Sequence, residues 1–179
     1  TSVIKDYSEL ALESLPRKTA IVLSDDPAQL FFLKAALNEH RSQNKYILLN
    51  TALVHYPDYL RYVQKKYRED WKDVITPDIR DVLSDSGAMQ VSMALFQRYP
   101  VYYLHPSFGY YFEQLYARPH GIVYELLPYP PNSVAAPPLR PELILENNNF
   151  WSRAEKRLGA VADILARPKI PSQPGLGRE

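Results

Sequence analysis

The chain has 179 residues, and its charged side chains nearly balance, with 21 Lys and Arg against 20 Asp and Glu. A net charge of +1 argues against a nucleic-acid-binding surface and against a polybasic membrane binder, because both need an excess of basic residues. Apolar residues make up 46% of the chain, which is enough for one sizeable core.

The residue content excludes further classes of protein. There are no cysteines, so disulfides, thiol catalysis and cysteine-ligated metal sites are excluded. No uninterrupted apolar run exceeds four residues, whereas a membrane-spanning helix needs about 20. Because the sequence starts at Thr1 without a signal-peptide pattern, we interpret it as processed or excised from a longer protein.

The first third of the chain alternates helices and strands. Its predicted elements are a helix at 6–15, a strand at 19–23, a helix from 27 to about 40, a strand at 45–49 and a helix at about 58–66. Asp26 fits the N-cap of the second helix, and Pro27 fits its first position. Such alternation favours a parallel sheet covered by helices.

The remaining two thirds add strands and then change in composition. The predicted elements are a short helix after Thr76-Pro77, a helix at 88–99, a strand at 101–104, a short aromatic helix at 108–116, a strand at 122–127 and a helix at 149–166. Residues 128–141 hold six prolines, which is typical of an extended linker.

These elements predict an α/β fold. We expect a three-layer, Rossmann-like, mainly parallel sheet of about four strands, followed by a proline-rich linker and a helix. The predicted division is an α/β domain at 1–130, a linker at 131–148, a helical extension at 149–167 and a flexible tail at 168–179.

The turn after the first strand is the most suggestive local feature. Ser24-Asp25-Asp26-Pro27 lacks the glycines of a dinucleotide site, and its carboxylates would repel phosphate. A carboxylate pair beyond a strand's carboxyl end is able to bind a sugar hydroxyl or a divalent cation. The structural interpretation, which we favour, is that Asp26 only caps the helix and Asp25 is exposed in the turn.

Two histidines follow predicted strands at the same end of the sheet as Asp25. His55 and His105 are therefore candidates for a three-group site with Asp25, although independent turn histidines are the favoured interpretation. No histidine has a metal-binding spacing such as HExxH, and Ser107 lacks the glycines of a nucleophile elbow. No metal or cofactor is expected.

The stretch from Phe96 to Tyr116 is rich in aromatic residues. Tyrosine faces and hydroxyls suit carbohydrate stacking or a partner interface, and core packing is the alternative. Tyr110 and Ser107 therefore join Asp25, Asp26, His55 and His105 as binding candidates. No catalytic residue is predicted.

Several segments, in order, resemble a known family. They are Tyr7–Pro16, Ala20–Asp26, Tyr46–Leu53, Pro57–Leu60, Tyr103–Gly109 and Arg118–Tyr124. They are similar to the soluble part that follows the membrane helices in bacterial multipass membrane proteins of unknown function, which are themselves similar to the transmembrane protein O-mannosyltransferase family. The turn at 24–27 departs from the glycine-bearing turn common in that family.

The resemblance implies glycosyl transfer for a whole protein whose catalytic carboxylate lies between early membrane helices, outside this chain. It implies that this piece is a non-catalytic, extracytoplasmic (periplasmic) accessory domain that binds an acceptor or braces the membrane part. The implied partners are the membrane-spanning part of the same polypeptide and a protein or glycan acceptor. The alternatives are a stand-alone sugar-processing or hydrolytic enzyme that uses Asp25 with His105, and a protein–protein interaction module.

Overall fold

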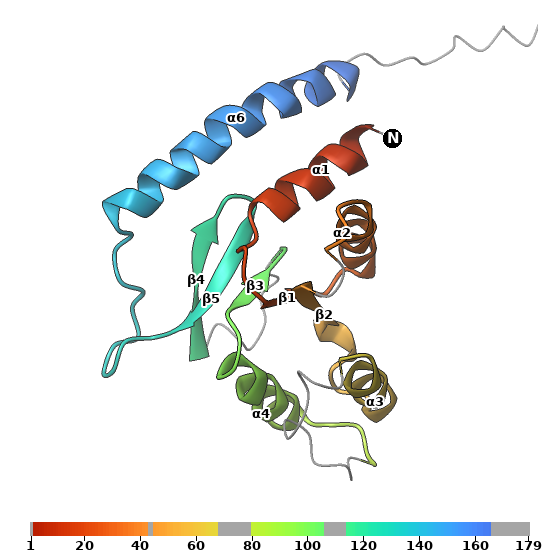
Figure 1. Ribbon diagram of the computed structural model, residues 1–179. Helices are drawn as coiled ribbons and strands as arrows, with labels where there is room; N and C mark the ends of the chain where they lie inside the picture. Colours follow the sequence, from red (N-terminus) through yellow and green to blue (C-terminus); the bar gives the residue numbers. More distant parts are fainter. Residues whose placement is uncertain (1, 43–44, 68–79, 106–113, 166–179) are drawn as a thin grey trace, which may run out of the picture.

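The computed structural model describes residues 2–42, 45–67, 80–105 and 114–165, and its centre is a five-stranded sheet (Figure 1). The strands are β1 (Ala20–Ser24), β2 (Tyr46–Asn50), β3 (Val101–Tyr103), β4 (Leu115–His120) and β5 (Val123–Pro128), in the order β2-β1-β3-β5-β4. β1 is parallel to β2 and β3, whereas β5 is antiparallel to β3 and β4. The α/β prediction is confirmed, but the sheet is mixed and has five strands instead of about four.

The described helices pack on this sheet or on one another. They are α1 (Ser2–Glu13), α2 (Pro27–Glu39), α3 (Pro57–Lys66), α4 (Asp85–Phe96), α6 (Pro141–Leu165) and the short 3-10 helix η2 (Thr51–Leu53). Asp26 caps α2 and Pro27 begins it, as predicted. Ser84 caps α4, so this helix begins three residues before the predicted Ala88. The helix predicted after Thr76-Pro77 starts outside the described residues.

Successive side chains of β1 point to opposite faces of the sheet. Val22 lies in a buried cluster with Leu33 of α2 and Ala11 of α1. Ile21 lies in a second buried cluster, together with Leu60 of α3 and with buried residues of α4. All five residues of β1 are buried, because helices cover both faces of this central strand.

β4 is the strand that the sequence analysis missed. The aromatic helix predicted at 108–116 falls mostly outside the described residues, but Leu115 and Tyr116 belong to β4. Pro119 lies inside the strand, and proline is tolerated there because β4 is at the edge of the sheet. Arg118 pairs with Glu125 across β4 and β5, which adds a cross-strand ion pair.

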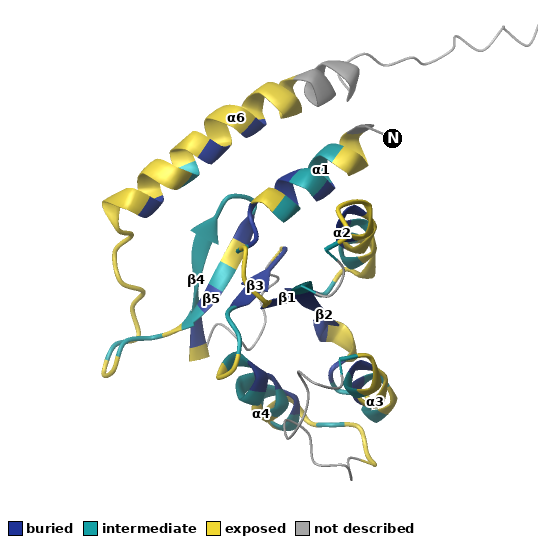
Figure 2. Ribbon diagram, in the orientation of Figure 1, coloured by how far each residue is buried: buried dark blue, intermediate teal, exposed yellow. Residues whose placement is uncertain are grey.

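Helix α6 lies along α1, beyond the proline-rich segment (Figure 1). It begins at Pro141, not at the predicted Asn149, so part of the expected linker is helical. Leu10 of α1, Phe150 and Ala154 form a small buried cluster between the two helices. Figure 2 shows most of α6 exposed, with its buried positions on the side toward α1.

Candidate functional site

The carboxyl ends of β1, β2 and β3 meet at one edge of the sheet because these strands are parallel. From β1 the chain passes through α2 to β2 on one side, and then through α3 and α4 to β3 on the other side. The connection that leaves β1 therefore runs to one side of this strand, and the connection that enters β3 returns to the other side. In open α/β sheets, ligands bind outside the carboxyl ends of the strands at such a switch point.

Asp25 and His105 flank this switch point. Leu23 and Tyr103 are register partners on β1 and β3, and the Leu104 amide donates to the Leu23 carbonyl at 2.9 Å. Asp25 comes two residues after Leu23, and His105 comes two residues after Tyr103. The two strands that they follow lie about 4.8 Å apart. Asp25 is half-buried and His105 is exposed. The structure thus brings these two predicted candidates to matched positions at one edge.

Asp26 has a structural role beside them. Its carboxylate accepts a hydrogen bond from the Ala28 amide at 2.8 Å, as the N-cap of α2. The buried Ser24 hydroxyl accepts from the Asp26 amide at 3.1 Å and donates to Oε1 of Gln29 at 3.1 Å. These bonds fix the turn between β1 and α2.

A polar pair that the sequence analysis did not single out lies beyond β2. Asn50 caps η2 by accepting from the Ala52 amide at 2.9 Å. The backbone amide of Asn50 donates to the Tyr59 hydroxyl at 2.7 Å. Burial raises the pKa of Tyr59 to about 12. The only local signal was an Asn-Thr pair directly after a predicted strand, since Tyr59 comes from the following helix.

Thr51 and Tyr103 form a buried hydrogen bond between the ends of β2 and β3. Their hydroxyl oxygens are 2.9 Å apart, and both residues are buried. β1 lies between β2 and β3 in the sheet, so this bond joins two strands that are not neighbours. It ties the start of η2 to the end of β3, on the two sides of β1.

His55 contacts the segment that precedes α4. Its Nδ1 lies 3.1 Å from the Leu83 carbonyl oxygen and 3.9 Å from Oδ1 of Asp85. The Leu83 amide in turn donates to the His55 carbonyl at 2.8 Å. His55 therefore fastens the chain before α4 to the loop after η2, which is a structural role.

The described tyrosines of the aromatic stretch are buried or half-buried. Tyr102 and Tyr103 are buried in the two faces of the sheet. Burial raises the pKa of Tyr102 to about 12, and the negative charge of Glu125 adds to this effect. Tyr116 is half-buried, with its ring 5.6 Å from that of Tyr129. The candidates Ser107 and Tyr110 lie outside the described residues.

Two further observations concern only the part of the chain that the structure describes. No group of three or more His, Asp or Glu side chains is placed to hold a metal ion there. No helix within the described ranges is both long and apolar enough to cross a membrane. In comparisons with known proteins, no protein-family model, no curated protein and no solved structure matches the chain.

Proposed function

We propose that this chain is a non-catalytic, extracytoplasmic accessory domain of a membrane glycosyltransferase-like protein, similar to the protein O-mannosyltransferases. Its fold is of the three-layer, Rossmann-like type, with the antiparallel strands β4 and β5 added to the parallel core. It binds a protein or glycan acceptor at the carboxyl edge of the sheet and braces the membrane part of the same polypeptide. The resemblance of its segments to that family is one support for this proposal.

The binding role is supported by the hydrogen bonds that the polar groups at the carboxyl edge form within the domain. Ser24, Asp26 and Asn50 form hydrogen bonds within their own turns, and Thr51 bonds to Tyr103. A general acid or base must be free to exchange a proton with substrate. Side chains that hold turns in place instead create a preformed surface, which favours binding.

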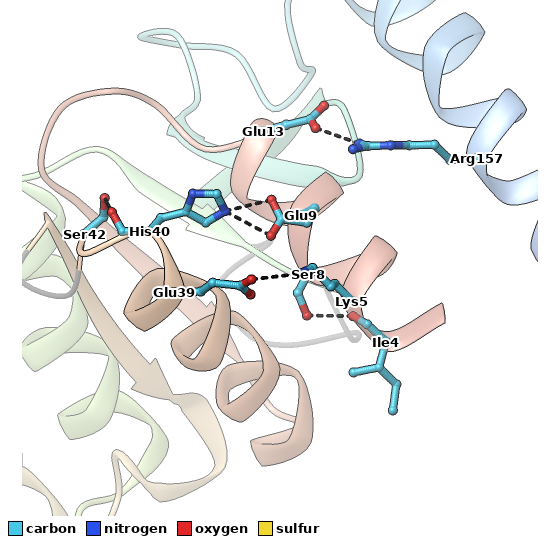
Figure 3. Close-up of polar contacts among 9 residues, drawn as sticks. All are labelled: Ile4, Lys5, Ser8, Glu9, Glu13, Glu39, His40, Ser42 and Arg157. Atoms are coloured by element: carbon cyan, nitrogen blue, oxygen red, sulfur yellow. Dashed lines mark hydrogen bonds and ion pairs between the residues drawn. The ribbon is translucent and has the colours of Figure 1, made fainter. Parts of the chain in front are cut away.

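The bracing role is supported by the contact of α1 with α6. Arg157 of α6 donates to Glu13 of α1 at 2.7 Å, and Lys5 of α1 pairs with Glu39 of α2 at 2.7 Å (Figure 3). The first and last described helices are thus joined to each other and to the body of the domain. Such an arrangement transmits a fixed orientation to whatever precedes α1.

An NMR titration tests the binding role. A ¹⁵N-labelled chain is titrated with a Ser/Thr-rich peptide and with a mannose oligosaccharide, as the two classes of acceptor. We expect chemical-shift changes centred on Asp25, Asn50 and His105, with an Asp25→Asn variant binding at least tenfold more weakly. A Glu155→Gln variant on α6, an exposed position on the helix that packs against α1 and not at this edge, serves as the charge-matched control. Turnover of a sugar donor by the chain alone would overturn the non-catalytic assignment.

A second candidate function is a stand-alone sugar-processing or hydrolytic enzyme. The observation that favours it is the matched placement of Asp25 and His105 across β1 and β3, because a carboxylate and an imidazole are suited to general acid–base catalysis. This candidate predicts that Asp25→Asn abolishes hydrolysis of sugar substrates without lowering the melting temperature. Hydrolysis that persists unchanged in the variant would eliminate it.

A further inference from the structure

A cavity of about 480 Å³ opens at the amino edge of the sheet, opposite to Asp25. Its walls come from four places in the chain: the end of α1 and the loop after it, the end of α2, the start of β2, and α6. Leu12, Leu15 and Pro16 give it an apolar side. Its volume is within the range of sites that enclose small molecules, roughly 300–1,000 Å³.

Three cationic side chains line this cavity: Arg17 before β1, Lys45 before β2, and Arg153 on α6. None of the three forms an ion pair with any residue that the structure describes. Nζ of Lys45 lies 5.6 Å from the centre of the Tyr46 ring, so its contact among the described residues is with an aromatic ring and not with a carboxylate. The chain as a whole has a net charge of only +1, so this is a local concentration of positive charge.

The nearby carboxylates of α1, Glu9 and Glu13, already contact other side chains (Figure 3). Both carboxylate oxygens of Glu9 lie 3.0 Å from Nε2 of His40, and Glu13 accepts from Arg157 at 2.7 Å. The Tyr46 hydroxyl donates to the Pro16 carbonyl at 2.6 Å, and the Ser42 hydroxyl to the His40 carbonyl at 3.2 Å. The charged groups of the cavity that have no ion-pair partner among the described residues are therefore the cations.

We propose that this cavity binds the phosphate group of a phosphorylated molecule, with the apolar wall contacting the rest of the ligand. Guanidinium groups pair with phosphate oxygens in bidentate geometry, and an ammonium group adds a point charge. Converging cations in a concave surface also raise the local concentration of anions. The site is separate from the acceptor-binding edge and does not depend on the proposed function.

Isothermal titration calorimetry of the full chain at low ionic strength tests this site, with inorganic pyrophosphate and glucose 6-phosphate as probes. We expect both to bind and unphosphorylated glucose to give no heat. Arg17→Gln and Arg153→Gln should each weaken pyrophosphate binding at least tenfold while leaving the melting temperature within about 2 °C, since both residues are exposed. Lys65→Gln, an exposed residue of α3 outside the cavity, is the matched control and should bind as the parent does.

Vesicle co-sedimentation distinguishes a free ligand from a lipid headgroup. Binding to phosphatidic-acid vesicles, but not to phosphatidylcholine vesicles, that is lost in Arg17→Gln would place the phosphate on a lipid. Binding of the soluble probes alone would place it on a small molecule. If no probe binds at millimolar concentration, or if Lys65→Gln weakens binding as much as Arg17→Gln does, the site does not exist.

Discussion

Gly121, in the turn between β4 and β5, lies so close to Ser14 after α1 that a Cβ atom on it would stand 2.2 Å from Ser14 Oγ. The φ angle of Gly121 is +62°, a conformation that costs other residues energy. The Ser14 hydroxyl accepts from the Ile122 amide at 3.1 Å, and the Gly121 amide donates to Asn147 at 2.7 Å. The hairpin turn is thereby locked between α1 and α6.

Gly121→Ala should therefore lower the free energy of unfolding by about 2–3 kcal/mol, because the added methyl group displaces Ser14 and strains the backbone. Gly159→Ala is the matched control, since a Cβ at that position would have nothing within 4 Å beyond its chain neighbours and the backbone of its own helix. The control should be neutral or more stable by about 0.5–1 kcal/mol, as alanine favours a helix. Urea unfolding of both variants measures the difference, and equal stabilities would contradict the packing described for the turn.

Phe150→Ala should release α6 from α1. Phe150 is 7% exposed and packs with Leu10 and Ala154, so its truncation should cost about 3 kcal/mol. Leu145→Ala, at a position 61% exposed on the same helix, should change stability by less than about 0.5 kcal/mol. Hydrogen exchange should rise along α6 in the first variant only; unchanged exchange there would show that Phe150 does not anchor the helix.

The two adjacent aspartates after β1 should respond differently to substitution. Asp26→Ala removes the cap of α2 and should cost about 1 kcal/mol. Asp25→Asn should stay within about 0.5 kcal/mol of the parent, because no described hydrogen bond or ion pair depends on its charge. Thermal melts of the two variants check this, and a larger loss in Asp25→Asn would mean that its carboxylate is structural.

Stability should fall in alkaline solution through Tyr59 and Tyr102. Both have a pKa raised to about 12 in the folded chain, against about 10 in the unfolded chain, mainly because of burial. The folded state then binds more protons above pH 10, so this contribution is complete below pH 10 and is lost as the pH rises toward 12. Urea midpoints measured from pH 9 to 12 should decline over that window.

Tyr59→Phe separates this effect from general alkaline unfolding. The variant should lose about 1–2 kcal/mol at pH 7, since the Asn50 amide would be left without its partner. It should also show a shallower decline above pH 10, because one of the tyrosines whose pKa is raised to about 12 in the folded chain is gone. A decline as steep as that of the parent would contradict the role of Tyr59.

The fold was predictable where local signals agreed with tertiary packing. The predicted strands near 19–23 and 45–49 lie within one residue of β1 and β2, and the Asp26-Pro27 signal marked the start of α2. β4 was missed because Pro119 argues against a strand, and only its place at the sheet edge removes that objection. The start of α6 was missed because six prolines from 128 to 141 suggested an extended chain, although Pro141 is itself a first helical residue.

The candidate site was predictable only in part. Asp25 and His105 lie at the same edge because they follow neighbouring parallel strands. The alternation of helices and strands in the sequence predicts such a parallel sheet. The bond between Thr51 and Tyr103 joins residues 52 positions apart, and no local pattern marks it. The cationic cavity was equally hidden, because Arg17, Lys45 and Arg153 come together only when α6 packs on α1.

The most direct test of the proposed function is the sequence encoded upstream of Thr1 in the gene. We predict about ten apolar segments of about 20 residues each, with an acidic residue in an early loop between them. That result would place this chain as the accessory domain of a membrane glycosyltransferase-like protein. A signal peptide or a stop codon directly upstream of Thr1 would contradict the account and leave a free-standing domain.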